Sequence, residues 1–173
     1  MKISQLKPEE YVPYFQIYFD QVSDEYSMIE ELEISVHRLV KFVQDIPMDK
    51  FDYRYAADKW TIKDILQHLI DSERIFAYRA LRIARNDKTE LPGFDDNHYA
   101  NETSANKRSI MSLLTELMAL RQSTILLFKT FSEAQLEFKG IVSGNPISVR
   151  ALGFLIIGHQ NHHQSVFDKY YLN

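Results

Sequence analysis

Three of the six histidines in this chain lie close together, at positions 159, 162 and 163. His159 and His163 are four residues apart, so on an α-helix their imidazoles lie on one face and can bind one divalent ion. His162 points about 100° away from His163 on an ideal helix, so we expect it to line a pocket or to hydrogen-bond a neighbouring group. The spacing therefore indicates a metal site.

The surroundings of this pair favour a metal site over a chance spacing. Two buried imidazoles need polar partners. A lone core histidine usually finds a carbonyl, and that remains the alternative here, whereas two histidines on one apolar face can share a cation. The apolar stripe on which the pair lies steps by threes and fours through Leu152, Ile156, His159, His163, Val166 and Tyr170.

The hydrophobic pattern predicts an all-α protein. Long segments with a period near 3.6 residues occur together with only five glycines and five prolines. After a short aromatic element at 11–19, we expect helices over residues 24–44, 61–86 and 105–131, and a last helix after Ser148. These helices predict a four-helix bundle that forms one domain over residues 1–173.

Two connections stand out in this pattern. Residues 87–104 are polar and rich in turn-forming residues, and they make a long crossover between the second and third helices. We expect this crossover to be a lid or the edge of a pocket. Residues 140–146 are predicted to be a loop.

His68 is the third candidate ligand, because it lies on the core stripe of the second predicted helix. Two facing helices can then place three imidazoles around one ion. His37 lies outside the core stripe of its helix and His98 lies in the crossover, so both are predicted to be surface residues. The core stripe of the second helix also contains Ile65, Ser72, Ile75 and Arg79.

The segments around these histidines, Lys59–Arg74 and Gly158–His163, resemble the DinB superfamily over nearly the whole chain. Within that resemblance, residues 79–86 followed by Leu91–Asp95 are similar to the YfiT-like branch, which is described as metal-dependent hydrolases and includes bacillithiol S-transferases. The resemblance implies a four-helix bundle with a three-histidine metal site. It places the ligands at His68, His159 and His163.

Three neutral imidazoles leave the charge of a zinc or nickel ion uncompensated and at least one coordination position open, as in catalytic zinc sites. Such an ion activates water for hydrolysis, or a thiol for attack on an electrophile. The residue after His159 is Gln160, which cannot accept a proton, so peptidase chemistry of the HExxH type is disfavoured. The chain contains no cysteine, which mildly favours a low-molecular-weight thiol as an external co-substrate.

Three charged residues are candidates for a catalytic or substrate-binding role. Asp71, three residues beyond His68, could orient an imidazole, and Asp95 lies in the crossover. Arg79 could bind a substrate carboxylate, or it could form a buried ion pair with an aspartate that only closes the bundle. Trp60 and the N-terminal tyrosines are predicted to be packing residues.

Composition narrows the range of partners. The net charge of -4 and the absence of basic runs argue against a nucleic-acid partner. The chain lacks an apolar signal core, and Phe154–Ile157, which is as long as any apolar stretch in it, is too short to cross a bilayer, so we expect a cytoplasmic protein without a membrane partner. The many aromatic residues are compatible with a homodimer.

Two functions of different classes follow from these residues. The first is a metal-dependent enzyme acting on a small molecule, either as a thiol S-transferase of the bacillithiol type or as a hydrolase. The alternative is a non-catalytic metal-binding protein that serves a stress response or a partner. An open coordination position facing a pocket favours the enzyme, and a closed site favours the alternative.

Overall fold

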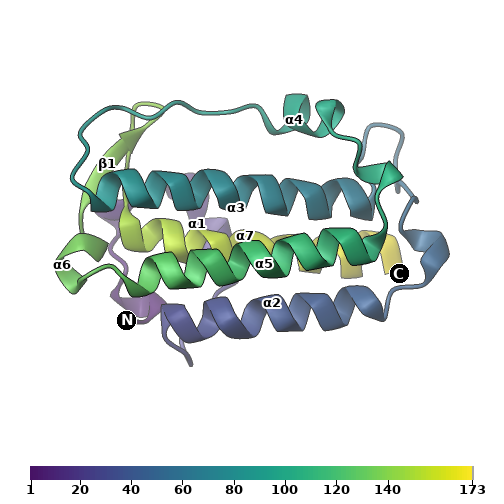
Figure 1. Cartoon of the computed structure of the whole chain (residues 1–173), viewed down its shortest axis with the longest axis horizontal. Helices are drawn as coiled ribbons and strands as arrows, with labels where there is room; N and C mark the ends of the chain where they lie inside the picture. Colours follow the sequence, from purple (N-terminus) through teal and green to yellow (C-terminus); the bar gives the residue numbers. More distant parts are fainter. Residues whose placement is uncertain (173) are drawn as a thin grey trace.

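The computed structural model describes residues 1–172, and four long helices form its body (Figure 1). These are α2 (Met28–Gln44), α3 (Ile62–Ala84), α5 (Ile110–Lys129) and α7 (Val149–Phe167). The predicted four-helix bundle is confirmed. The shorter helices are α1 (Gln16–Phe19), α4 (Asp96–Glu102) and α6 (Glu133–Leu136), and a π-helical turn, Asp168–Leu172, follows α7. Single 3-10 turns occur at Ile3–Gln5, Pro8–Glu10, Pro13–Phe15, Met48–Lys50 and Ala105–Lys107.

The order of the helices explains the long crossover. Helix α3 packs against both α5 and α7, and α2 packs against the same two helices. Figure 1 shows that the chain runs back along the bundle after α3, so that α3 and α5 point in the same direction. Parallel neighbours cannot be joined by a short turn. The crossover carries α4 above α3, a helix that the turn-rich sequence of this segment had concealed.

Side-chain caps set where the long helices begin. The Thr61 hydroxyl accepts a hydrogen bond from the Asp64 amide, which confirms the predicted cap of α3. Ser148 caps α7 in the same way. Helix α2 begins later than predicted because Ser27 caps it, and α5 begins later because Ser109 does.

The predicted core stripes are correct to within about one residue. Ile75 is only half-buried, and its neighbour Phe76 is in the core. In the π-helical turn after α7, Tyr170 is exposed, whereas Tyr171 is buried against Phe167 and donates a hydrogen bond to the Trp60 carbonyl. The buried row thus continues from His163 in steps of four residues, where the pattern had suggested a step of three.

The prediction of a loop at 140–146 is wrong. Strands β1 (Lys139–Val142) and β2 (Asn145–Ser148) form an antiparallel hairpin whose turn residues, Ser143 and Gly144, have positive φ angles of 49° and 75°. Pro146 pairs with Ile141, one step beyond the pair that flanks the two-residue turn. That position makes no ladder hydrogen bonds, so a proline fits there.

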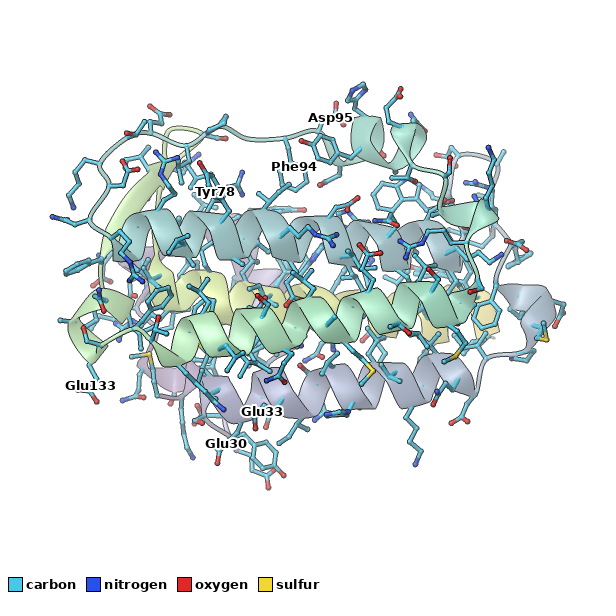
Figure 2. All side chains as sticks on the ribbon, in the orientation of Figure 1. Glu30, Glu33, Tyr78, Phe94, Asp95 and Glu133 are labelled. Atoms are coloured by element: carbon cyan, nitrogen blue, oxygen red, sulfur yellow. The ribbon has the colours of Figure 1, made fainter. Side chains whose placement is uncertain are left out.

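The hairpin holds the start of the crossover in place. The Leu91 amide donates to the Ile141 carbonyl at 2.9 Å, and the Ser143 amide donates to the Leu91 carbonyl at 3.0 Å. This pairing fixes the segment that follows Leu91, which passes over α3. In Figure 2 Phe94 points from the crossover down towards α3.

A buried ion pair joins all four long helices. Arg121 of α5 and Glu73 of α3 are 1% and 3% exposed, and Arg121 Nε and Nη2 each donate to the Glu73 carboxylate at 2.9 Å. The guanidinium also donates to the Leu32 carbonyl and the Ser35 hydroxyl of α2, and to the Gln160 side chain of α7. The pair is therefore well supplied with hydrogen bonds, as a buried charge requires.

The N-terminal segment is tied to α7 at two points. Arg150 donates to the Glu10 carboxylate, and both side chains are buried. Further along, Gly158 allows α1 to approach closely, because a Cβ at position 158 would lie 2.2 Å from the Tyr18 carbonyl oxygen. These two contacts bring the aromatic side chains of the N-terminal segment to the bundle.

Helix α5 is long and apolar enough to cross a membrane by length and composition, although polar residues interrupt its apolar runs. One such helix is weak support for a membrane location, because core helices of soluble proteins share these properties. Here the helix packs against α2 and α3 and buries a charged residue, Arg121.

We predict that Arg121→Met lowers the free energy of unfolding by about 3–5 kcal/mol, because it leaves the Glu73 carboxylate buried without its partner. Arg74→Met is the matched control on α3. Its ion pair with Glu116 is partly exposed, so the loss should stay below about 1 kcal/mol. Urea denaturation measures both changes, and equal losses for the two variants would contradict this role of Arg121.

Candidate metal centre

Helices α3 and α7 lie side by side and bring the three predicted ligands together. His68 Nε2 lies 3.0 Å from His159 Nε2, and His163 Nε2 lies 3.2 Å from His159 Nε2. One nitrogen of each of the three rings lies within 4.8 Å of the others. His68 and His159 are buried, and His163 is partly buried.

The two short distances between ring nitrogens suit a tetrahedral ion. Imidazole nitrogens bound to zinc at about 2.0–2.1 Å are separated from each other by about 3.3 Å, which is close to the two distances between ring nitrogens found here. Without an ion, three ring nitrogens that face one another can satisfy only some of their lone pairs. The residues present therefore fit a divalent cation.

Burial keeps these imidazoles neutral. It lowers the pKa of His68 to about 4. Burial, together with the charges of the neighbouring histidines, holds the pKa of His159 and of His163 well below the usual range. Near neutral pH all three rings are uncharged, so their lone pairs are available to a cation without prior loss of a proton.

The second nitrogens of the rings differ in their surroundings. His68 Nδ1 lies 3.4 Å from the Ser72 hydroxyl and 3.8 Å from Asp96 Oδ1. Asp71, proposed from the sequence to orient an imidazole, instead accepts a hydrogen bond from Gln67 at 3.0 Å. Asp96 of α4 is thus the carboxylate beside His68. His163 Nδ1 is buried and has no hydrogen-bond partner within residues 1–172.

A cavity of about 240 Å³ opens beside His68 and His159. Its walls are mostly apolar and come from the N-terminal segment, α3, the crossover, the β-hairpin and α7. The predicted role of the crossover as a pocket edge fits this arrangement, because Gly93, Phe94 and Asp96 line the cavity. His162 and His163 border a second, more open cavity that includes Trp60 and Asn97.

The sequence candidates take different positions around the main cavity. Arg79 lines it, is 7% exposed and donates to the Pro92 carbonyl at 2.8 Å. Asp95 does not line it; its carboxylate caps α4 by accepting from the His98 amide (Figure 2). The next residue, Asp96, is the one that reaches the cavity. Burial and the charge of Asp95 raise its pKa, against the influence of Arg79.

Gln160 lies away from the metal centre. Its side chain is buried and binds Arg121 and the Ser35 carbonyl. It therefore belongs to the buried network that joins the four helices. In HExxH peptidases the residue after the first histidine is the general base. Here that residue is Gln160, and its side chain serves the contact between helices, which agrees with the argument against this chemistry.

Aromatic side chains that the sequence predicts to be packing residues border the histidines. The Tyr18 ring lies 5.3 Å from the rings of His159 and His162, and the Trp60 ring lies 4.9 Å from that of His68. Tyr18 belongs to the aromatic N-terminal element. Its contact with α7 joins segments far apart in the sequence, so no local sequence pattern predicts it. His37 and His98 are exposed, as expected.

Comparisons with known proteins agree with this architecture. The sequence profile of the DinB superfamily matches residues 31–167. A protein from Oceanobacillus iheyensis named "Putative metal-dependent hydrolase OB0413" is 23% identical over 145 residues, covering 82% of each chain. The solved structure of YfiT from Bacillus subtilis matches with a TM-score of 0.74 at 19% identity, covering 95% of this chain and 91% of that one. It was described as a probable metal-dependent hydrolase with an unusual four-helix bundle topology.

We predict that His68→Ala, His159→Ala and His163→Ala each lower the bound zinc well below one ion per chain and lower the melting temperature of the zinc-loaded protein. Each change removes one of three ligands, and the ion binds the folded state alone. Elemental analysis and thermal unfolding with and without a chelator measure the effect.

His162→Ala is the matched control, because its ring lies beside the cluster but outside it. It should retain zinc. Full zinc content in all three cluster variants would show that these histidines do not bind the ion.

Proposed function

Because this chain belongs to the DinB superfamily and its three imidazoles converge beside an apolar cavity, we propose that it is a metal-dependent enzyme acting on a small molecule. His68, His159 and His163 are the proposed ligands. The observation that carries this proposal is the cavity of about 240 Å³ at the edge of the cluster, which leaves room for a substrate. A purely structural ion would instead be closed off by a fourth protein ligand.

The proposed ion is zinc or nickel, because imidazole nitrogen suits both. When bound, it would act as a Lewis acid that lowers the pKa of a thiol or a water molecule. The protein's own part is to hold three neutral imidazoles in place and to keep bulk water out of the apolar cavity. Tyr18, Phe76 and Leu155 supply apolar parts of that cavity wall.

The proposed reaction is the transfer of a low-molecular-weight thiol to an electrophilic carbon. The new sulfur–carbon bond forms as the bond from that carbon to its leaving group breaks, and the proton of the thiol departs with the leaving group. Two features support this choice. The chain contains no cysteine that a reactive electrophile could modify, and the apolar cavity disfavours water as the competing nucleophile.

Hydrolysis is the second candidate, and Asp96 is the observation that favours it. Its carboxylate lies on the cavity wall, 3.8 Å from His68, and its pKa is raised by burial, so it could accept a proton from water. The description of the Oceanobacillus relative as a metal-dependent hydrolase points the same way.

The setting of the reaction also belongs to this proposal. We infer a cytoplasmic protein with a small-molecule substrate and neither a nucleic-acid nor a membrane partner, as the acidic composition suggests. Homodimerisation stays a prediction. Exposed Met111, Met118 and Leu126 follow one another along α5 and would supply apolar surface for it.

A substitution at Asp96 distinguishes hydrolysis from thiol transfer. If the enzyme hydrolyses esters through this carboxylate, Asp96→Asn should lower the rate about 100-fold or more, because the general base is lost. If it transfers a thiol that the ion itself activates, the same change should alter the rate less than about tenfold. Parallel assays of zinc-loaded protein with p-nitrophenyl acetate and with 1-chloro-2,4-dinitrobenzene plus a small thiol measure both rates.

Asp95→Asn is the matched control, since asparagine also caps helices and the side chain lies outside the cavity. Cobalt-substituted protein provides an independent test. Its visible spectrum should change when a small thiol is added, and the change should be lost in His163→Ala. A spectrum that does not respond to thiols, together with no turnover of either substrate, would refute the enzyme proposal.

A further inference from the structure

Among the residues that the structure describes, Arg79 is a buried cation without an ion-pair partner. It is 7% exposed, yet no described carboxylate forms an ion pair with it. Its protein contacts are the Pro92 carbonyl, the face of Phe94 at 5.5 Å, and a longer-range attraction to Asp96. The alternative raised by the sequence, a buried arginine–aspartate pair that only closes the bundle, is therefore not what the structure shows.

A guanidinium group carries five N–H donors, and the Pro92 carbonyl uses one of them. No Arg79 nitrogen is among the buried atoms that lack a partner, so the remaining donors are open to the cavity rather than sealed in the core. Arg79 lines the same cavity as His68 and His159, so its free donors can be reached by a molecule bound there. The group that best matches a planar guanidinium is a carboxylate, which accepts two parallel hydrogen bonds.

Arg79 and His68 lie on the same helix at a defined separation. Eleven residues of α-helix advance about 16 Å along the axis. Long side chains on a helix lean towards its start, so the Arg79 guanidinium can lie closer to His68 than this axial distance. Between the two positions the cavity wall is apolar, with Phe76 from the same helix and Leu152 and Leu155 from α7.

We propose that the substrate is an apolar carboxylic acid whose carboxylate binds Arg79 and whose reacting carbon lies at the three-histidine centre. Resting on the metal-dependent function proposed above, this assignment adds the substrate class. Phe94, held over Arg79 by the pairing of Leu91 with the β-hairpin, covers the guanidinium and shields the carboxylate from water. Arg79 thus selects a negatively charged ligand and fixes its orientation in the cavity.

The test uses 4-phenylbutanoate and its uncharged amide, 4-phenylbutanamide, as probes of the zinc-loaded, full-length protein. Calorimetric titration at pH 7 gives the two dissociation constants. We expect the acid to bind about tenfold or more tightly than the amide, because a buried guanidinium prefers the charged group. Arg79→Met should abolish this preference and leave the affinity for the amide within about twofold of its original value.

Arg82→Met is the matched control. Arg82 lies on the same helix and carries the same charge, but its side chain binds Asp87 and Tyr78 outside the cavity. The preference should survive in this variant. Arg79→Lys guards against a folding defect in Arg79→Met, since it keeps the charge but loses the two-point contact, and the preference should fall without disappearing.

Repeating the titrations after removal of the metal separates this proposal from the proposed function. A preference that depends on Arg79 and persists without metal supports the carboxylate site, even if the protein proves to have no activity. Equal affinity for the two probes, or an unchanged preference in Arg79→Met, would overturn it. If the preference for the acid disappears when the metal is removed, and is unchanged in Arg79→Met while the metal is bound, the carboxylate binds the ion instead.

Discussion

The buried pair of Arg121 and Glu73 is the contact on which the rest of the structure depends. A guanidinium and a carboxylate in the core are stable only while their hydrogen bonds are complete, and completing them requires all four long helices. Glu73 lies five residues after His68 on α3, and Gln160 directly follows His159 on α7. The same network therefore fixes how far α3 and α7 can slide past each other, and with it the distance between the imidazoles on the two helices.

The core thus contains two adjacent polar clusters with opposite character. Around Arg121, the guanidinium donors are bound to acceptors of the protein itself, so this cluster needs no external ligand. At His68, His159 and His163, the ring nitrogens face one another, and they border a cavity. A neutral imidazole has one N–H and one lone pair, so three ring nitrogens that face one another cannot all be satisfied within the cluster, and a cation completes it. The first cluster holds the helices together, and the second is the part that can exchange ligands with its surroundings.

Periodicity and caps were enough to predict the bundle and the positions of the three histidines. The crossover was also visible, because its turn residues interrupt the pattern. What the sequence could not supply were contacts between distant segments. The sequence does not distinguish Asp95 from Asp96. In the structure Asp95 caps α4, and this places the next residue, Asp96, at the cavity. Tyr18 reaches His159 because Gly158 has no side chain, and Pro146 concealed a strand because its pairing position was unknown.

Different parts of this fold carry the three histidines and one wall of the cavity. The three histidines lie on helices fixed by the buried core, whereas Gly93, Phe94 and Asp96 belong to a connection that contributes a wall of the cavity but none of the three ring nitrogens. Substitutions in that connection can change the shape and charge of the cavity while the ion-binding geometry stays the same. Proteins built on this scaffold can therefore diversify in the molecules they accept by varying one segment, and the parallel arrangement of α3 and α5 makes that segment unavoidably long.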